Sequence, residues 1–147
     1  MKLTRHTDYA LRVLMFLALQ KNERLVTVSD IADHFDIPRN HLVKIVHQLG
    51  QLAYVCTVRG KGGGMRLGRP AGSIGIGEVV RDVETTLEVV NCLQPECPLL
   101  PDCSLRGVLH EARDAFIGVL DKYTLVDLVA RPRKMQTLLQ WHPVKAV

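Results

Sequence analysis

Residues 27–50 read TVSDIADHFDIPRNHLVKIVHQLG, and this stretch decides the fold. Thr27 or Ser29 can cap a first helix, and the break at residues 36–38 ends it, because Pro38 suits the start of a new helix. The new helix runs to about Leu49 and has an apolar inner face made of Leu42, Val43, Ile45, Val46 and Leu49. Two short helices joined by a tight turn predict a helix-turn-helix.

The outer face of the second of these helices is polar and basic. It carries Arg39, Asn40, His41, Lys44 and His47, and no acidic residue occurs from residue 37 to residue 77 to pair with the bases. Asn and Arg side chains can bond two atoms of one base edge in the major groove of DNA. The pattern therefore predicts a DNA-reading helix.

A short hairpin follows the helix-turn-helix. Residues 52–58 and 65–67 favour strands, and between them lies Arg59-Gly60-Lys61-Gly62-Gly63-Gly64. A glycine-rich tip lets backbone and basic side chains approach phosphates, so Arg59 and Lys61 are candidate DNA contacts. The alternative is a flexible hairpin without a function. We expect a winged helix-turn-helix domain over residues 1–85, with the wing at about 54–68, in a mainly α fold with one small β-hairpin.

The distribution of charge along the chain supports binding to a polyanion. The 147 residues carry a net charge of +4, but residues 1–70 hold eleven Lys and Arg against five Asp and Glu. Such asymmetry is typical of nucleic-acid binding, although chance clustering on a solvated surface is the plainer alternative. The longest apolar run, residues 13–19, is far too short to span a membrane. We expect a cytoplasmic protein with no membrane partner, and no residue pattern predicts an enzyme.

Three cysteines form a second motif. Cys92, Cys97 and Cys103 are spaced C-x4-C-x5-C on a proline-rich loop, residues 86–103. Zinc sites favour closer pairs and four protein ligands, whereas an iron–sulfur cluster tolerates looser spacing and non-Cys ligands. Three small apolar side chains are the plainer alternative. The spacing favours one cluster per subunit, either 2Fe–2S or 4Fe–4S. Cys56, in the strand before the wing, is expected to be structural.

The segment after the loop predicts a long amphipathic helix. Apolar residues recur at steps of three and four from Leu105 to Leu120. The stripe is longer than a small neighbouring domain needs, so residues 104–130 are expected to dimerise and to end in a short helix capped by Thr124 and Asp127; packing on its own chain is the alternative. Residues 131–147 are expected to be a partly disordered tail.

Asp8 precedes a helix expected over residues 9–19. Asp8 can cap that helix, and Arg12, one turn further on, is then a surface residue. Alternatively, Arg12 can orient Asp8 for another role by a charged hydrogen bond.

Several of these stretches resemble one family of proteins. LTRHTDY at 3–9, RNHLVKIV at 39–46, VRGKGGG at 58–64, Asn91-Cys92 and YTLVDL at 123–128 resemble the Rrf-type winged-helix regulators, over about residues 1–130. Within that family the likeness is to the nitric-oxide-sensing repressors. The resemblance implies a homodimer that binds a palindromic operator on double-stranded DNA while its cluster is intact, and that releases it when nitric oxide attacks the cluster.

The resemblance also implies a ligand set. The cluster ligands map onto Cys92, Cys97 and Cys103, with Asp8 supplied by the partner subunit and Arg12 beside it. Regulators of iron–sulfur supply in the same family carry a His three residues after the third Cys, where this chain has Arg106. That departure counts against the supply sensor, which stays the first alternative. The second, a small iron–sulfur electron carrier, leaves the basic helix and wing unexplained.

Overall fold

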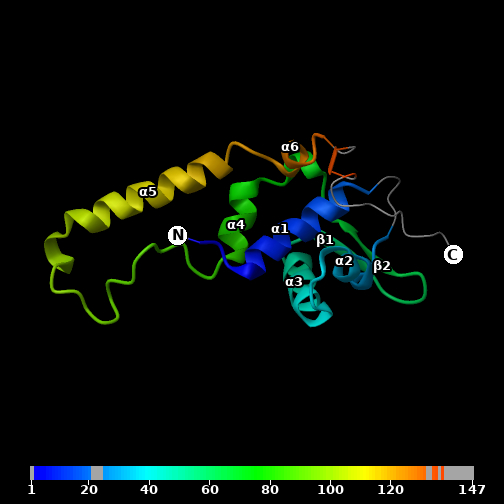
Figure 1. Ribbon diagram of the computed structural model, residues 1–147, viewed down its shortest axis with the longest axis horizontal. Helices are drawn as coiled ribbons and strands as arrows, with labels where there is room; N and C mark the ends of the chain where they lie inside the picture. Colours follow the sequence, from blue (N-terminus) through cyan, green and yellow to red (C-terminus); the bar gives the residue numbers. More distant parts are fainter. Residues whose placement is uncertain (1, 21–24, 132–133, 136, 138–147) are drawn as a thin grey trace.

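The structure, a computed structural model, describes residues 2–20, 25–131, 134, 135 and 137. It is mainly helical with one two-stranded hairpin, as the sequence predicts (Figure 1). The elements in chain order are α1 (Arg5–Ala18), α2 (Val28–Phe35), α3 (Arg39–Gln51), β1 (Val55–Val58), β2 (Gly64–Leu67), the 3-10 turn η1 (Ala71–Ser73), α4 (Ile76–Val83), the 3-10 turn η2 (Leu100–Asp102), α5 (Ser104–Leu120) and α6 (Leu125–Leu128).

The helix-turn-helix has the expected helix ends. Thr27, rather than Ser29, caps α2, because its hydroxyl accepts from the Asp30 N–H at 3.1 Å while the Asp30 carboxylate accepts from the Thr27 N–H at 2.8 Å. Asp36 then adopts a left-handed conformation with φ 53°, which turns the chain, and Pro38 precedes the first residue of α3. The turn thus carries α3 away from the axis of α2.

The first helix begins earlier than the sequence predicts. Its N-cap is Thr4, whose hydroxyl accepts from the Thr7 N–H at 3.3 Å, so α1 starts at Arg5 and not at Tyr9. Asp8 therefore lies inside the first turn of α1. The interpretation of Asp8 as the helix cap is wrong, because a threonine four residues earlier already fills that position.

One buried tyrosine joins the hairpin to α4. Tyr54 is fully buried beneath the Arg69 guanidinium, 4.5 Å from its ring centre, and its hydroxyl donates to Asp82 at 2.6 Å. Burial raises the pKa of Tyr54. Arg69 also pairs with Glu78 at 2.8 Å, and this hydrogen bond holds the pKa of Glu78 below its usual range. The base of the wing is thereby fixed to the helix that precedes the cysteine loop.

The wing is a tight antiparallel hairpin in which Val58 pairs with Gly64. Gly60 and Gly62 have φ values of 100° and 77°, which favour glycine. A side chain on Gly63 would clash with the Val58 carbonyl oxygen, so the turn has no room for one. The glycine-rich tip is therefore a defined turn that carries Arg59 and Lys61 outward.

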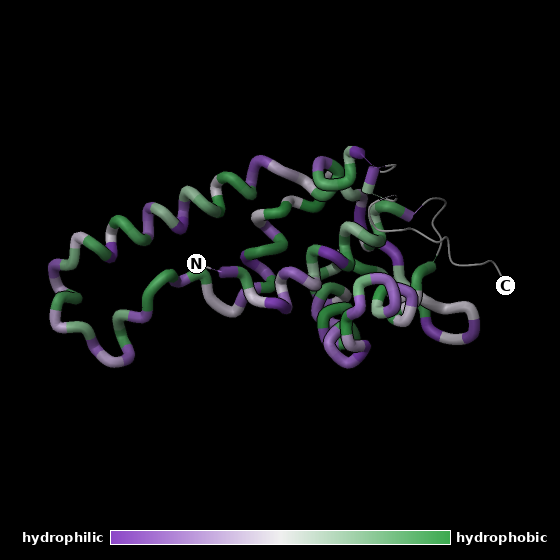
Figure 2. Tube along the Cα trace, in the orientation of Figure 1, coloured by the Kyte–Doolittle hydropathy of each residue, from purple (hydrophilic) through white to green (hydrophobic). Residues whose placement is uncertain are grey.

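Helix α5 projects away from α1, α2, α3 and the hairpin (Figures 1 and 2). Ile117 is the one residue of α5 that is buried. Arg81 of α4 anchors the C-terminal end of α5 by donating to both Asp121 carboxylate oxygens, at 2.6 and 3.1 Å. The predicted capping box of Thr124 and Asp127 is confirmed at the start of α6.

The predicted domain boundaries stay predictions. The boundary at 85/86 follows the end of α4, and that at 103/104 falls at the first residue of α5. The predicted tail lies almost wholly outside the described residues. None of the described helices is both long and apolar enough to cross a membrane.

Candidate DNA interface and cysteine loop

The outer face of α3 presents the expected polar and basic side chains to solvent. Those exposed are Arg39, Asn40, His41, Lys44 and His47. The prediction that no acid pairs with them is wrong at one position: the fold brings Asp33 of α2 to 3.5 Å from Arg39. Both side chains are more than half exposed, so this pair is weak and can exchange for a phosphate or base contact.

One apolar residue of α3 that the sequence predicts to be buried in the core is exposed in the structure. Val43 is 56% exposed, whereas Leu42, Ile45, Val46 and Leu49 are buried as predicted. Val43 lines an open hollow of about 460 Å³ between α2, α3 and β1. The basic face therefore contains an exposed valine at its centre.

The tip of the wing carries exposed positive charge. Arg59 and Lys61 are exposed, and within the described part of the chain neither makes an ion pair. Lys44 of α3 is likewise exposed without an ion pair among the described residues. Unpaired cations on two neighbouring elements form a surface that suits the phosphates of a duplex.

Local hydrogen bonds shape the cysteine loop. The Asn91 side-chain oxygen accepts from the backbone N–H groups of Leu93 and Gln94, at 3.1 and 3.2 Å. The Cys97 N–H donates to the Cys92 carbonyl at 3.0 Å, which closes a turn between the two cysteines. Cys103 is the N-cap residue of α5. Asn91 thus fixes the backbone next to the first cysteine.

The three thiols are available but are not gathered in one chain. Cys92, Cys97 and Cys103 are all free and half-buried. In the described part of a single chain, no three His, Cys, Asp or Glu side chains converge closely enough to hold a metal ion. The loop thus supplies three free thiols, while the described residues of one chain contain no preformed site for a single metal ion.

Arg106 lies between the two ends of this loop. It lines a hollow of about 440 Å³ beside Cys92 and another of about 460 Å³ beside Cys103. Residues 84–105 contain four acids and no Lys or Arg, so Arg106 is the first cation after the loop. Its positive charge suits a pair of thiolates on either side.

The loop is braced against α5 by one acid. Glu88 accepts from Arg113 at 3.0 Å and lies 3.3 Å from His110. Sequence reasoning missed this contact, because it joins residues 22 and 25 positions apart on elements of different type. A contact of this kind leaves no periodic signal.

Arg12 holds Asp8 by charged hydrogen bonds, as expected if Arg12 orients the Asp8 carboxylate. Arg12 donates to both carboxylate oxygens, at 2.9 Å from Nη2 and 3.1 Å from Nε. The guanidinium also lies 6.0 Å from the ring centre of Phe35, the last residue of α2. Asp8 is about half exposed and is not gathered with the cysteines in one chain.

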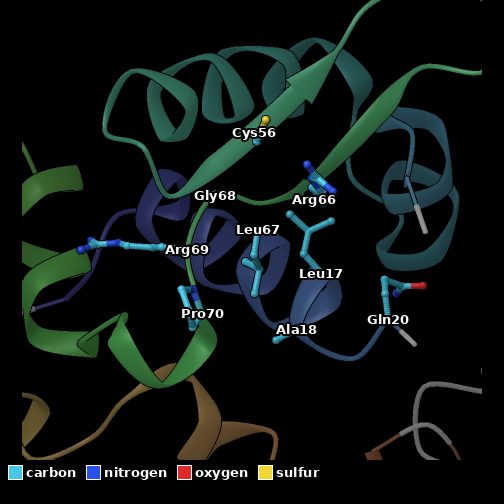
Figure 3. Close-up of a pocket in the computed structure, with 9 residues that line it drawn as sticks. All are labelled: Leu17, Ala18, Gln20, Cys56, Arg66, Leu67, Gly68, Arg69 and Pro70. Carbon is cyan, nitrogen blue, oxygen red and sulfur yellow. The ribbon is translucent and has the colours of Figure 1, made fainter. Parts of the chain in front are cut away.

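Cys56 lies apart from the cysteine loop. It is exposed on β1 and lines a hollow of about 530 Å³ between the hairpin and the end of α1 (Figure 3). Its neighbours there include Leu17 and Arg66. The expectation that Cys56 is structural stays a prediction, because its thiol is exposed and does not pack in the core.

Comparisons with known proteins agree on one family. A family model described as Rrf2, iron-dependent transcriptional regulator, matches residues 3–131. The chain is 48% identical over 143 residues to the HTH-type transcriptional regulator NsrR of Bacillus subtilis strain 168, covering 95% of this chain and 98% of that protein. It is 46% identical over 142 residues to the NsrR of Bacillus licheniformis, covering 95% and 99%.

A solved structure supports the same fold. The structure of CymR, the global cysteine regulator of B. subtilis, matches with a TM-score of 0.71 at 28% identity, covering 88% of this chain and 97% of that one. The likeness therefore extends over most of both chains.

Proposed function

Because the chain belongs to the Rrf2 family of transcriptional regulators and is similar to its NsrR members, we propose that it is a repressor that senses nitric oxide through an iron–sulfur cluster. Nitric oxide releases the repressor from its operator, and genes of the nitrosative-stress response are then expressed. The observation that carries the proposal is the pairing of a basic helix-turn-helix and wing with three free cysteines on one loop.

DNA binding is assigned to α3 and the wing. Asn40 lies in the first turn of α3, the end of a recognition helix that meets base edges, and Arg39 and His41 flank it. Lys44, Arg59 and Lys61 supply charges for the phosphates. This division lets α3 select the sequence while the wing contributes affinity that depends little on sequence.

The cluster is assigned to the cysteine loop. The donor set fits an iron–sulfur cluster: three free thiols on a stiff loop, with Arg106 beside two of them. When bound, the cluster supplies iron atoms that react with nitric oxide. The chain's own part is to bring Cys92, Cys97 and Cys103 together and to offset their negative charge.

The exposed face of α5 is assigned to the contact with a second copy of the chain. Leu105 is 65% exposed and Val108 is 60% exposed, and Val119 also lies open to solvent. Only one residue of this seventeen-residue helix is buried, so the helix requires a partner to cover its apolar side. A two-fold dimer reads two half-sites, which explains a palindromic operator.

The dimer also explains the position of Asp8. Its carboxylate is accessible at the start of α1 and already aligned by Arg12, so it is suited to be the fourth ligand of the partner's cluster. Arg12 also lies near Phe35 of α2. A change at Asp8 is thereby passed to the helix-turn-helix.

The test is to purify the protein anaerobically and to measure its absorption spectrum, iron and sulfide content, and operator binding before and after nitric oxide. The proposal expects a visible chromophore, about one cluster per chain, and loss of specific binding on exposure to nitric oxide. Release by cluster loss without a response to nitric oxide would identify a sensor of iron–sulfur status instead. A cluster in a protein that binds no DNA would identify an electron carrier.

A further inference from the structure

The exposed valine of α3 is at the centre of the surface that faces DNA in the proposed function. Val43 lies one helical turn after Asn40 and one turn before His47, on the same side of α3. Its exposed fraction of 56% is large for an aliphatic side chain in a helix whose other apolar residues, Leu42, Ile45, Val46 and Leu49, are buried. Core packing therefore does not account for Val43.

The hollow beside Val43 has both apolar and polar walls. Val46 and His47 of α3, Val28 of α2, and Val55 and Thr57 of β1 line it together with Val43. The volume is about 460 Å³, and the hollow is open to solvent. Lys44, the residue after Val43, is exposed on α3, and so is Asn40. A group that contacts Val43 meets aliphatic carbon, and Lys44, next to Val43 in the chain, adds an exposed positive charge.

The residues around Val43 indicate which kind of group contacts it. The adjacent Lys44 repels cationic partners and attracts a polyanion. In the major groove of DNA, the apolar group that a base pair presents is the C5-methyl group of thymine, which aliphatic side chains contact. We propose that Val43 is a specificity-determining residue that packs against the methyl group of one thymine in each half-site, a step that rests on the proposed reading of DNA by α3.

The proposal predicts a sequence preference that hydrogen bonding by Asn40 does not explain. Cytosine at the same position lacks the methyl group and so cannot make this contact with Val43. Uracil has the hydrogen-bonding groups of thymine and differs by that methyl group alone. Replacing thymine with uracil therefore tests the contact without changing any polar group of the base pair.

The experiment uses the full-length protein, purified anaerobically, and a duplex that it selects from a random pool of double-stranded DNA. Each thymine of this duplex is replaced by uracil, one at a time, and the Kd is measured for the wild type, Val43→Ala and a matched control, Val126→Ala. Val126 is an exposed valine of α6, an element separate from α3.

Each half-site is expected to contain one sensitive thymine. Replacing that single thymine with uracil is expected to weaken binding by the wild type and by Val126→Ala about fourfold, as burial of one methyl group predicts. Val43→Ala is expected to bind the thymine and uracil duplexes equally. Undiminished sensitivity in Val43→Ala, or no sensitive thymine in the wild type, overturns the proposal while leaving the repressor intact. A pool that yields no preferred duplex overturns DNA reading by α3 itself, and the role of Val43 with it.

Discussion

His6 of α1 and Gln48 of α3 are joined by a contact of 2.6 Å between the imidazole Nε2 and the amide Oε1. His6 lies two residues before Asp8, and Gln48 lies near the end of the helix that carries Asn40 and Lys44. This partly buried contact connects the helix that carries the proposed cluster ligand to the helix proposed to read DNA. A shift of the first turn of α1 is therefore passed directly to α3.

We expect His6→Ala to weaken operator binding by the cluster-loaded protein without unfolding it, because α3 loses a polar anchor on α1. A neutral hydrogen bond contributes about 1 kcal/mol, so a loss of about fivefold in affinity is expected. Fluorescence anisotropy with labelled operator measures it, and the visible spectrum of the cluster is expected to stay unchanged.

The control for this contact is a double-mutant cycle with Gln48→Ala. If the two side chains act through each other, the double variant binds operator as weakly as either single variant. Additive losses would show that His6 and Gln48 influence DNA binding separately, and would contradict the coupling.

Replacing Asn40 and Lys61 is expected to affect DNA binding in different ways. Asn40→Ala is expected to cost about 1–3 kcal/mol at one base pair of the operator and to relax the preference there. Lys61→Ala is expected to weaken operator and unrelated DNA alike and to lower the salt dependence by about one ion. Titrations at several salt concentrations with both duplexes distinguish them. An equal loss on both duplexes in Asn40→Ala would refute its reading role.

Local signals were sufficient to predict most of the elements. A cap at Thr27 or Ser29, the spacing of Thr124 and Asp127, and the glycines of the wing each act through hydrogen bonds or backbone freedom within a few residues. The start of α1 was placed too late, because the apolar pattern begins after the cap at Thr4. Elements defined by short-range contacts are readable from sequence; their ends depend on single capping groups.

Contacts between different elements could not be predicted in this way. Val43 follows Leu42 directly, so it lies at the edge of the apolar stripe, and the packing of α1, α2 and β1 on α3 decides that it stays outside. The Asp33–Arg39 pair depends on the turn between α2 and α3. The thiols do not converge within one described chain, so neither periodicity nor the single-chain fold reveals the geometry of a completed site.

A charge on the exposed face of α5 is expected to prevent dimerisation. Val108→Glu places a carboxylate in an apolar stripe that a second copy covers in the proposed dimer, and the side chain is 60% exposed in the single chain, so the fold of each chain is retained. Sedimentation analysis is expected to show a folded monomer that binds full operator poorly. A folded monomer that protects both half-sites as well as the wild type does would contradict the dimer.

Serine substitutions are expected to separate the loop cysteines from Cys56. Cys92→Ser, Cys97→Ser or Cys103→Ser removes a thiolate, so visible absorption and specific operator binding are expected to fall together. Cys56→Ser is the matched control, because Cys56 lies on β1 outside the loop, and it is expected to retain both. Full cluster content in Cys97→Ser, or its loss in Cys56→Ser, would overturn the ligand assignment.

The assignment of Asp8 as the fourth cluster ligand depends on two chains, because Asp8 is proposed to bind the cluster of the partner subunit. Asp8 lies inside α1, so its carboxylate does not cap the helix, and Arg12 holds it in a two-point hydrogen bond. Such a pair on an exposed helix face contributes only about 0.3–0.5 kcal/mol to folding. A structural role alone therefore predicts almost no consequence when Asp8 is replaced.

Ligation predicts a different result for Asp8→Ala. An oxygen ligand is bound more weakly than a thiolate, and its loss changes the electronic surroundings of one iron. We expect the circular dichroism and visible spectrum of the anaerobically prepared cluster to change, and its reaction with nitric oxide to change in rate, while the thermal unfolding midpoint moves little. Arg12→Gln keeps the carboxylate but removes its ion-pair partner, so it is expected to shift the same spectrum less. If Asp8→Ala retains the wild-type spectrum and rate, Asp8 is not a ligand and the Asp8–Arg12 pair is only a surface contact.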